Sequence, residues 1–238
     1  MAKLSISQKL HKDLELLISK TSPGERLPSE PHLAQQLGVS RATLREAMRT
    51  FETQGMIRRR QGSGTYVTHP PHVIASGLEV LESLETLAKR TDLHLEMGEL
   101  QITRRNAQPE ECMALNLETC DEVIDIQRVM RAKDRPIAYL VDTLPTDILT
   151  PDELEIGFTG SVLDFLLERG TPELQVSHLE INAAPASSRM ARAMGIQRRA
   201  VLLYFNARLY DTDGRAVDYS TSYFLPGYFR FHVVRRVG

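Results

Sequence analysis

Two short helical segments joined by a glycine turn, within residues 30–51, constrain the fold of this chain more than any other stretch of its sequence. The first segment, 30–37, ends at Gly38, and the second begins after Ser40, whose side chain is a suitable N-cap. Apolar residues recur in the second segment at helical i, i+3, i+4 and i+7 positions: Leu44, Ala47, Met48 and Phe51. This pairing predicts a helix-turn-helix, whose second helix enters the major groove of DNA.

Arginines line the face of the second helix that is opposite its apolar stripe. Arg41, Arg45 and Arg49 are spaced four residues apart, and Thr43 lies near the N-terminal end, where base contacts concentrate. A guanidinium group can bind guanine through two hydrogen bonds or clamp a phosphate. This face is therefore a candidate DNA contact. Taken alone, the helix is equally compatible with a solvated arginine stripe.

The sequence RRRQGSGTYV, at residues 58–67, follows this helix and predicts a β-hairpin. Residues 56–57 and 66–67 favour strands, and the glycine-rich sequence at 61–64 favours the tight turn between them. Glycine at the tip lets the backbone approach the floor of a groove, and the arginines at 58–60 are placed to contact phosphates. An isolated arginine cluster is usually a solvated surface. Following a capped helix with its own arginine face, it indicates a DNA-binding wing.

A further helix and a loop precede these elements. Residues 6–19 place apolar side chains at helical spacing: Ile6, Leu10, Leu14, Leu17 and Ile18. The sequence SPGERLPSE then predicts a loop, in which Ser29 is positioned to cap the helix at 30–37. Residues 1–68 are thus expected to form one domain.

Charge is divided unevenly along the 238 residues. Residues 1–68 contain 11 Lys and Arg against 6 Asp and Glu, whereas the remaining 170 contain 18 against 25. A basic module joined to an acidic one indicates a polyanion reader coupled to a second function. The chain has only two cysteines, too few for a disulfide framework, which favours the reducing cytoplasm. It has no apolar run of the roughly 20 residues needed to cross a bilayer, so no membrane partner is expected. A DNA-binding protein of this kind is expected to be associated with the nucleoid.

Residues 69–77, which begin with HPPH, predict a short linker to a second domain at 78–238. Apolar spacing predicts a helix at 75–90, and turn sequences near 133–135 and 211–214 join neighbouring strands as hairpins. The expected strands are 96–107, 122–132, 137–145, 174–184, 200–211, 216–225 and 228–236, with helices near 109–117, 161–169 and 186–194. Strands joined by hairpins predict an antiparallel sheet with helices to one side, an α+β domain.

The second domain carries no enzyme signature. The sequence contains no nucleophile elbow, no phosphate-cradling glycine loop and no metal-ligand set at the usual spacing. We therefore expect neither an enzyme nor a metal or other cofactor. Two alternatives remain open: a lyase-like enzyme attached to a DNA-binding module, and a constitutive DNA binder without an effector.

Over residues 5–68 the chain resembles the GntR family of bacterial winged-helix regulators. The match is carried by GERLPSE, LAQQLGVSRATLREAMRTFETQGMI and RRRQGSGTYV. It implies that Arg41 and Arg45 contact guanine or phosphate, Thr43 the DNA backbone and Gly62 the minor groove. The other residues expected at the DNA are Ser29, Ser40, Arg49, Arg60, Ser63, Gly64 and Thr65.

One position departs from the pattern of this family. Relatives often carry an arginine immediately after PSE, and that arginine reads a guanine. This chain has Pro31 there, followed by His32. Operator specificity at this position is therefore expected to differ, and His32 is a weak substitute for the arginine.

Residues 78–236 resemble the UTRA effector-binding domain, which defines the HutC subfamily and shares its fold with chorismate lyase. The resemblance lies in the strand order and in VMRAKDRPIAYLVDTLP, GSVLDFLLERG and NARLYDTDGRAVDYSTSYF. It implies a small-molecule pocket between the sheet and the helix near 161–169, and a homodimer formed through this domain. Such a dimer would bind double-stranded DNA at an inverted-repeat operator, most often as a repressor that a metabolite releases.

The pocket implied by this resemblance differs from that of sugar-phosphate-sensing relatives. They place arginines at the positions of Arg128 and Met130 and a glutamate at Leu140, so this chain keeps half of an anion clamp. The remaining pocket candidates are Ser161, Leu163, Asp218, Phe224 and Tyr204, with Arg208 as an alternative to Tyr204. We expect an effector with one anionic group and a more apolar body than a phosphosugar. The alternatives are core packing of the apolar residues and a surface ion pair for Arg128.

Overall fold

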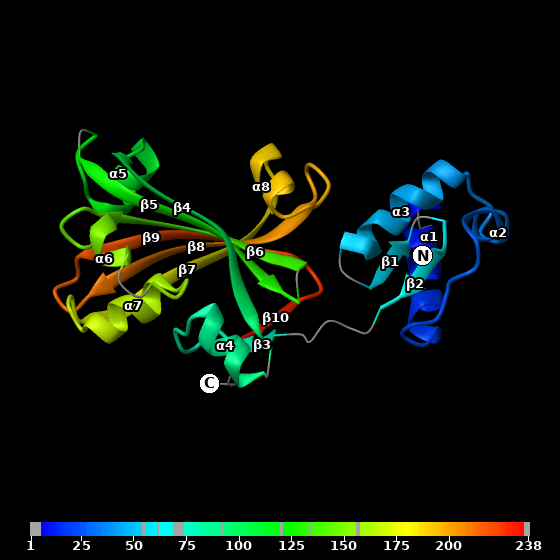
Figure 1. Ribbon diagram of the computed structural model, residues 1–238, viewed down its shortest axis with the longest axis horizontal. Coiled ribbons are helices and arrows are strands. Elements are labelled where there is room, and N and C mark those ends of the chain that lie inside the picture. Colours follow the sequence, from blue (N-terminus) through cyan, green and yellow to red (C-terminus); the bar gives the residue numbers. More distant parts are fainter. Residues whose placement is uncertain are drawn as a thin grey trace. The chain divides into compact units, whose positions relative to one another are not determined.

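The computed structural model of the chain describes residues 6–53, 56–60, 62–68, 74–91, 93–119, 121–133, 135–155 and 158–235. These residues form two compact units, and the first gives way to the second after residue 73 (Figure 1). Each unit has its own hydrophobic core. Residues 69–73 of the expected linker and Gln61 of the expected hairpin turn lie outside the described residues.

The first unit consists of three helices followed by a two-stranded antiparallel hairpin. Its elements in chain order are α1 (Ile6–Lys20), α2 (Glu30–Gln36), α3 (Arg41–Thr53), β1 (Ile57–Arg60) and β2 (Gly64–Val67). This is the order of a winged helix-turn-helix, so the fold class expected for this part of the chain is confirmed.

The core of the first unit is built from one side of each helix. Leu14 of α1, Leu33 of α2, and Leu44 and Met48 of α3 are fully buried, and Ile57 closes the core from the hairpin. Each fully buried aliphatic side chain contributes about 1.5–3 kcal/mol relative to an exposed one. Because these residues hold one side of α3 inward, the arginine side of α3 faces solvent.

The second unit is organised around a six-stranded antiparallel sheet with the strand order β4-β5-β6-β9-β8-β7 (Figure 1). Its strands are β4 (Leu95–Asn106), β5 (Glu122–Ala132), β6 (Arg135–Pro145), β7 (Leu174–Pro185), β8 (Val201–Asp211) and β9 (Ala216–Phe224). Two three-stranded meanders, β4–β5–β6 and β7–β8–β9, meet where β6 pairs with β9. The prediction of an antiparallel α+β domain is confirmed.

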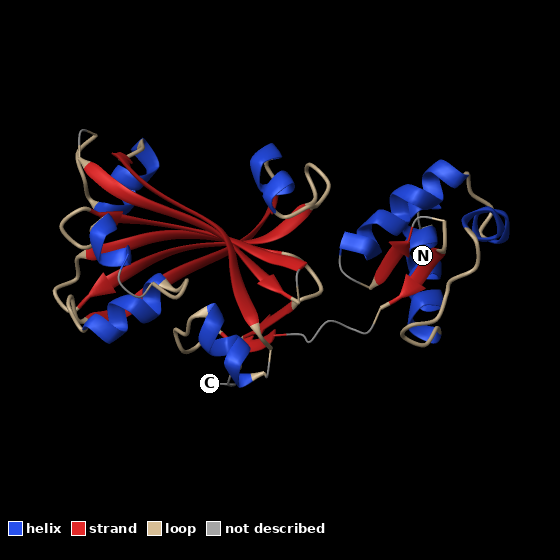
Figure 2. Cartoon of the chain, in the orientation of Figure 1, coloured by secondary structure: helices blue, strands red, loops and turns tan. Residues whose placement is uncertain are grey.

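Helices cover both faces of this sheet, whereas the sequence predicts them on one side (Figure 2). They are α4 (Leu84–Arg90), α5 (Pro109–Leu115), α6 (Pro151–Glu155), α7 (Val162–Arg169) and α8 (Ser188–Ala193). α5 packs on Val123 of β5, whereas α7 packs on Ile124 and Ile126 of the same strand. Successive strand residues point to opposite faces. The sheet therefore has an α7 face, which carries Ile124 and Ile126, and an α5 face, which carries Val123.

A separate strand pair lies at the two ends of the second unit. β3 (Ile74–Gly77) pairs in parallel with β10 (Phe229–His232), and neither strand belongs to the six-stranded sheet. The strand expected at 228–236 is therefore shorter than predicted, and the end of the expected linker is itself a strand. Aromatic rings pack together beside the pair, namely those of Phe224, Phe229 and Phe231.

The helix expected at 75–90 is wrong in its first half. α4 begins only at Leu84, because the Oγ of Ser83 accepts a hydrogen bond from the backbone N–H of Thr86 at 2.9 Å and caps the helix there. Leu81, which the apolar spacing places on the buried stripe, is 50% exposed. The leucine spacing upstream of Ser83 thus coincides with helical periodicity without forming a helix.

Candidate DNA interface and effector site

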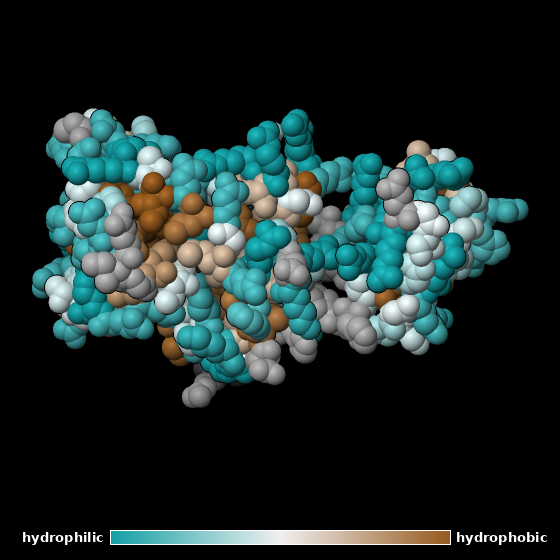
Figure 3. Space-filling model, viewed as in Figure 1, coloured by the Kyte–Doolittle hydropathy of each residue, from teal (hydrophilic) through white to brown (hydrophobic). Residues whose placement is uncertain are grey.

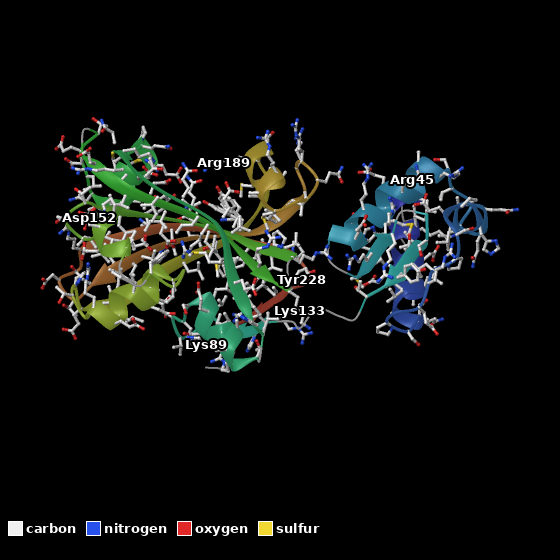
Figure 4. The ribbon with its side chains drawn as sticks, viewed as in Figure 1. Arg45, Lys89, Lys133, Asp152, Arg189 and Tyr228 are labelled. Carbon is white, nitrogen blue, oxygen red and sulfur yellow. The ribbon has the colours of Figure 1, made fainter. Side chains whose placement is uncertain are left out.

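α3 places its arginines on one exposed face of the first unit. The Oγ of Ser40 accepts a hydrogen bond from the backbone N–H of Thr43 at 3.1 Å, so Ser40 caps α3 as predicted. Arg41, Arg45 and Arg49 then line one shallow concavity together with Ala42 and Glu46. The surface over α3 is mostly hydrophilic in Figure 3, and Figure 4 marks Arg45 on this helix. The prediction that these arginines share an exposed face is confirmed.

Two of the three arginines have acidic partners. Arg45 donates from Nε to Glu30 Oε2 at 2.6 Å, and Arg49 donates from Nη1 to Glu46 Oε2 at 3.0 Å. Both arginine side chains remain about half exposed, at 54% and 52%. Exposed ion pairs contribute only about 0–1 kcal/mol, so phosphates can replace these carboxylates at little cost. Glu30 therefore orients Arg45 without withholding it from DNA.

The residues near α2 and in β2 that the sequence suggests for DNA contact differ in their exposure and hydrogen bonding. Ser29 stands at the N-cap position of α2, but its side chain makes no capping hydrogen bond, so that predicted cap is wrong. Pro31 lies in the first turn of α2, where proline is tolerated because the N–H groups have no helical partner. His32 is exposed. Thr65 in β2 is only 6% exposed, so its side chain belongs to the interior of the unit and not to its surface.

The three wing arginines divide between two sides of β1. Arg58 and Arg60 are exposed, whereas Arg59 is half-buried on the other side. The Arg59 guanidinium lies 3.6 Å from Glu30 and 3.8 Å from Glu52, and its backbone N–H donates to Glu52 Oε1 at 3.2 Å. Arg59 therefore ties the hairpin to α2 and α3. Among the three, Arg58 and Arg60 remain the candidates for phosphate contacts.

The tip of the wing depends on two glycines. Gly62 has φ +74° and Gly64 has φ +122°, both in the region that strains other residues. A Cβ on Gly64 would collide with the guanidinium of Arg26, whereas one on Gly62 would meet nothing within 4 Å. The hydroxyl groups of Ser63 and Tyr66 lie 2.7 Å apart and brace the turn. Arg26 is an exposed cation beside this tip that the sequence analysis did not select, although it belongs to the GERLPSE motif.

Most of the predicted effector residues lie on the α7 face of the sheet. Arg128 and Met130 continue the alternation of Ile124 and Ile126 along β5, and Leu140 of β6 lies directly opposite Arg128. The same face receives Asp218 and Phe224 from β9, and Ser161 and Leu163 from the start of α7. The structure therefore brings these residues to one side of the sheet.

Tyr204 lies on the opposite face. Its register partner is Tyr223, which in turn lies opposite Tyr139, the residue next to Leu140 in β6. Because neighbours along a strand point in opposite directions, Tyr204 and Leu140 project from different faces. Arg208 has the same parity along β8 as Tyr204. The structure thus separates Tyr204, and its alternative Arg208, from the other effector candidates.

A buried ion pair occupies the centre of the candidate effector site. The guanidinium of Arg128 donates to Oδ2 of Asp142 on the adjacent strand β6, and the two residues are 5% and 8% exposed. The Nε of Arg128 has no hydrogen-bond partner among the described residues. Of the two interpretations of Arg128, half of an anion clamp or a surface ion pair, the structure shows an ion pair, but one that is buried and not at the surface. Asp142 was not predicted, because its proximity depends on the pairing of β5 with β6.

Two further carboxyl groups surround this ion pair. Asp218 is 5% exposed, and burial, reinforced by the charge of Asp142, raises the pKa of Asp218 well above its ordinary value. Glu85 lies in the first turn of α4, and burial raises the pKa of its carboxyl although Arg128 opposes the shift. In the part of the chain that the structure describes, Asp218 Oδ1 and Glu85 Oε1 accept no hydrogen bond.

The N-termini of α4 and α7 meet at this site. Ser83 donates from Oγ to Asp164 Oδ2 at 2.6 Å, and Ser161 Oγ accepts from the backbone N–H of Asp164 at 3.0 Å. Ser161, predicted to contact the effector, is therefore the N-cap of α7 and is 3% exposed. Its hydroxyl hydrogen is still available to a ligand, because the capping bond uses only a lone pair.

A second polar basin, which the sequence analysis did not anticipate, lies on the α5 face. It encloses about 400 Å³, and its lining includes Arg105, Glu111, Asp125 and Arg189. Arg105 Nη2 donates to Glu111 at 2.6 Å and to Asp125 at 2.8 Å. Although burial opposes the shift, the hydrogen bonds from Arg105 lower the pKa of Glu111. This basin is a self-paired ionic network.

The described ranges lack two further classes of feature. No helix there is long and apolar enough to cross a bilayer. Nor does that part of the chain contain a group of three or more His, Cys, Asp or Glu residues arranged to hold a metal ion.

Comparison with known proteins matches both units. Residues 4–67 match the bacterial regulatory proteins of the gntR family, and residues 93–230 match the UTRA domain. The mannosyl-D-glycerate transport/metabolism system repressor MngR of Escherichia coli (strain K12) is 29% identical over 213 residues, covering 89% of this chain and 87% of that protein. The histidine utilization repressor of Pseudomonas aeruginosa is 29% identical over 170 residues, covering 71% and 67%. The crystal structure of PhnF from Mycobacterium smegmatis shares the fold, with a TM-score of 0.64 at 22% identity over 96% of this chain and 100% of that one.

Proposed function

Because this chain belongs to the gntR-type bacterial regulators that carry a UTRA domain, we propose that it is a homodimeric repressor released from an inverted-repeat operator by a small molecule. Transcriptional repression is the activity of this type of protein, and its relatives are repressors and not enzymes. The dimer, the symmetry of the operator, the place of the effector and action on the cytoplasmic nucleoid are the new elements of the proposal.

The exposed arginine face of α3 is the observation that supports DNA binding most directly. Capping by Ser40 and burial of the opposite stripe leave Arg41, Arg45 and Arg49 exposed on the face that would enter a major groove. The exposed wing arginines and the glycine tip are suited to phosphates and to a groove edge. We therefore assign base reading to the N-terminal half of α3 and phosphate binding to the wing.

A twofold dimer presents two such helices. Its operator would carry two inverted half-sites about one helical turn apart, or roughly 34 Å. We infer from the family resemblance that the two copies contact each other through the second unit, so the half-site spacing would depend on the conformation of that unit.

The effector would act by favouring a conformation whose two α3 helices no longer match this spacing. A ligand shifts such an equilibrium only by its difference in affinity for the two states, and couplings of about 1–3 kcal/mol are usual. A coupling of this size lowers operator affinity about 5- to 150-fold. We place the effector on the α7 face, where Arg128, Met130 and Leu140 converge.

DNA binding is tested with a duplex that the wild-type protein selects from a random pool. Fluorescence anisotropy should show that Arg41→Ala weakens binding to this duplex by about 1–3 kcal/mol, with a smaller effect on a scrambled duplex. Lys12→Ala is the matched control, because Lys12 is an exposed cation of α1 outside the arginine face. Equal weakening on both duplexes would show that Arg41 does not read bases. Failure of the wild-type protein to select any sequence would overturn the proposed function.

A further inference from the structure

The charges buried at the centre of the α7 face do not balance. Three carboxyl groups, those of Asp142, Asp218 and Glu85, interact with one guanidinium group, that of Arg128. Asp142 already forms an ion pair with Arg128. The same guanidinium is the cation that acts on Asp218 and on Glu85. This group of four side chains, the acid cluster, is therefore short of positive charge.

A carboxylate buried without a cation is strongly unfavourable, and proteins respond by keeping the group protonated. The raised pKa values of Asp218 and Glu85 agree with this response. Protonation removes the charge but leaves acceptor atoms unused. Within the described structure, Asp218 Oδ1 and Glu85 Oε1 still have no hydrogen-bond donor. Asp218 is only 5% exposed. Buried acceptors without a donor are rare in proteins.

The free donor of the acid cluster adds a second requirement. Arg128 Nε is buried and has no acceptor among the described residues. Met130 and Leu140, which are 1% and 5% exposed, provide apolar surface beside it. A ligand complementary to this site would combine N–H donors, one acceptor and an apolar portion.

Building on the proposed effector function of this unit, we propose that the effector carries a protonated nitrogen group, an ammonium or amidinium, that binds against Asp218 and Glu85. Its N–H groups satisfy the two unpaired oxygen atoms. One of the two carboxyl groups releases its proton to solvent when the cation binds, and the carboxylate that forms balances the charge of the cation. An acceptor atom of the same molecule faces Arg128 Nε. This cation replaces the single anionic group expected from the sequence, because Asp142 has already neutralised the guanidinium on which that expectation depended.

The charge preference is tested by calorimetric titration of the full-length protein with benzamidinium, benzamide and benzoate. These probes share a ring and a size but are cationic, neutral and anionic. A second set is glucosamine, glucose and glucose 6-phosphate. We expect the cation of at least one set to bind about tenfold or more tightly than its neutral and anionic counterparts, as a charged hydrogen bond would give. Tighter binding of the anions, equal binding within each set, saturation of the site by Mg²⁺ alone, or no binding at millimolar concentrations would overturn the inference.

Substitutions then locate the cation. Asp218→Asn and Glu85→Gln retain the shapes of the side chains and remove their capacity for negative charge. Either one should reduce the cation preference about tenfold. Asp213→Asn is the matched control, because Asp213 lies in the exposed turn between β8 and β9, and it should change nothing. If both cluster variants keep their fold by circular dichroism and also keep the preference, the acid cluster does not bind the cation.

Operator binding by the same samples separates this inference from the proposed function. A cation that binds through the acid cluster but leaves the selected duplex bound would contradict release by the effector and support cation binding. Release of the duplex by an anionic or neutral ligand of the α7 face would support the repressor mechanism and overturn the cation inference.

Discussion

Asp142 and Asp218 face one guanidinium group, so removing the two carboxyls singly and together should have unequal effects on stability. Asp142 is paired to Arg128, and the pKa of Asp218 is raised, so at a pH below that raised pKa Asp218→Asn exchanges one neutral group for another. We expect it to change the free energy of unfolding by about 1 kcal/mol or less. Asp142→Asn alone should cost more, because Asp218 must then ionise to balance Arg128.

The double substitution Asp142→Asn/Asp218→Asn deprives the buried Arg128 of both the carboxylate on the adjacent strand β6 and the carboxyl group on the next strand, β9. Removing the partner of a buried ion pair costs about 3–5 kcal/mol. For domains of this size, about 1 kcal/mol shifts Tm by about 2–4 °C. The double variant should therefore melt roughly 6–20 °C lower than the wild type. Glu85 is a poor replacement, since burial already disfavours its charged form.

Differential scanning calorimetry of the full chain at pH 5 and pH 8 measures both effects. Because the pKa of Asp218 is higher in the folded than in the unfolded state, its contribution to stability is present at low pH and is lost as the pH rises. The Tm of Asp218→Asn relative to wild type should accordingly increase from pH 5 to pH 8. Asp213→Asn should show no such trend. The reasoning is refuted if Asp142→Asn alone costs as much as the double substitution, or if Asp218→Asn becomes less stable relative to wild type at pH 8.

Three further predictions concern the first unit. Arg60→Ala should lower the slope of log DNA affinity against log salt concentration by about 0.9, the value for one phosphate contact. Arg59→Ala should leave this slope unchanged and lower the stability of the unit; anisotropy titrations across a salt series compare the slopes of the two variants. Gly64→Ala should destabilise the unit by about 1 kcal/mol or more in urea unfolding, and by more than Gly62→Ala, because the φ of +122° at Gly64 lies further from the left-handed helical region than the φ of +74° at Gly62; equal costs would contradict this reasoning. Leu14→Ala should cost about 2–5 kcal/mol and lower only the calorimetric transition of the first unit, and a shift of both transitions would show that the two units unfold together.

The helix-turn-helix could be predicted because its signals are local. Ser40 caps α3 by accepting a hydrogen bond from the backbone N–H of Thr43, three residues further along, and the buried stripe of α3 repeats within the helix itself. The helix predicted at 75–90 fails for the opposite reason. Residues 74–77 pair with residues 229–232, and no pattern near residue 75 can indicate a partner so distant in the chain.

The candidate effector site was only partly predictable, because it too depends on contacts between residues that are distant in the chain. Arg128, Met130 and Leu140 were identified through resemblance, and alternation along a strand correctly places the first two on one face. The partner that changes the chemistry of Arg128 is Asp142, whose position depends on the register between β5 and β6. Glu85 reaches the site from a helix that is separate from the sheet. The sequence does not indicate that Tyr204 projects from the opposite face, because its face depends on the register of β8 against β9.

The pairing of β3 with β10 has a genetic consequence. A premature stop codon near position 229 would leave intact every residue assigned to the operator or to the effector. It would nevertheless deprive Ile74–Gly77, where the polypeptide enters the second unit, of its hydrogen-bonded neighbour. Such an allele is expected to be uninducible: repression would be retained and induction lost. The inducer would still bind the second unit, but that unit would no longer be coupled firmly to the DNA-binding unit.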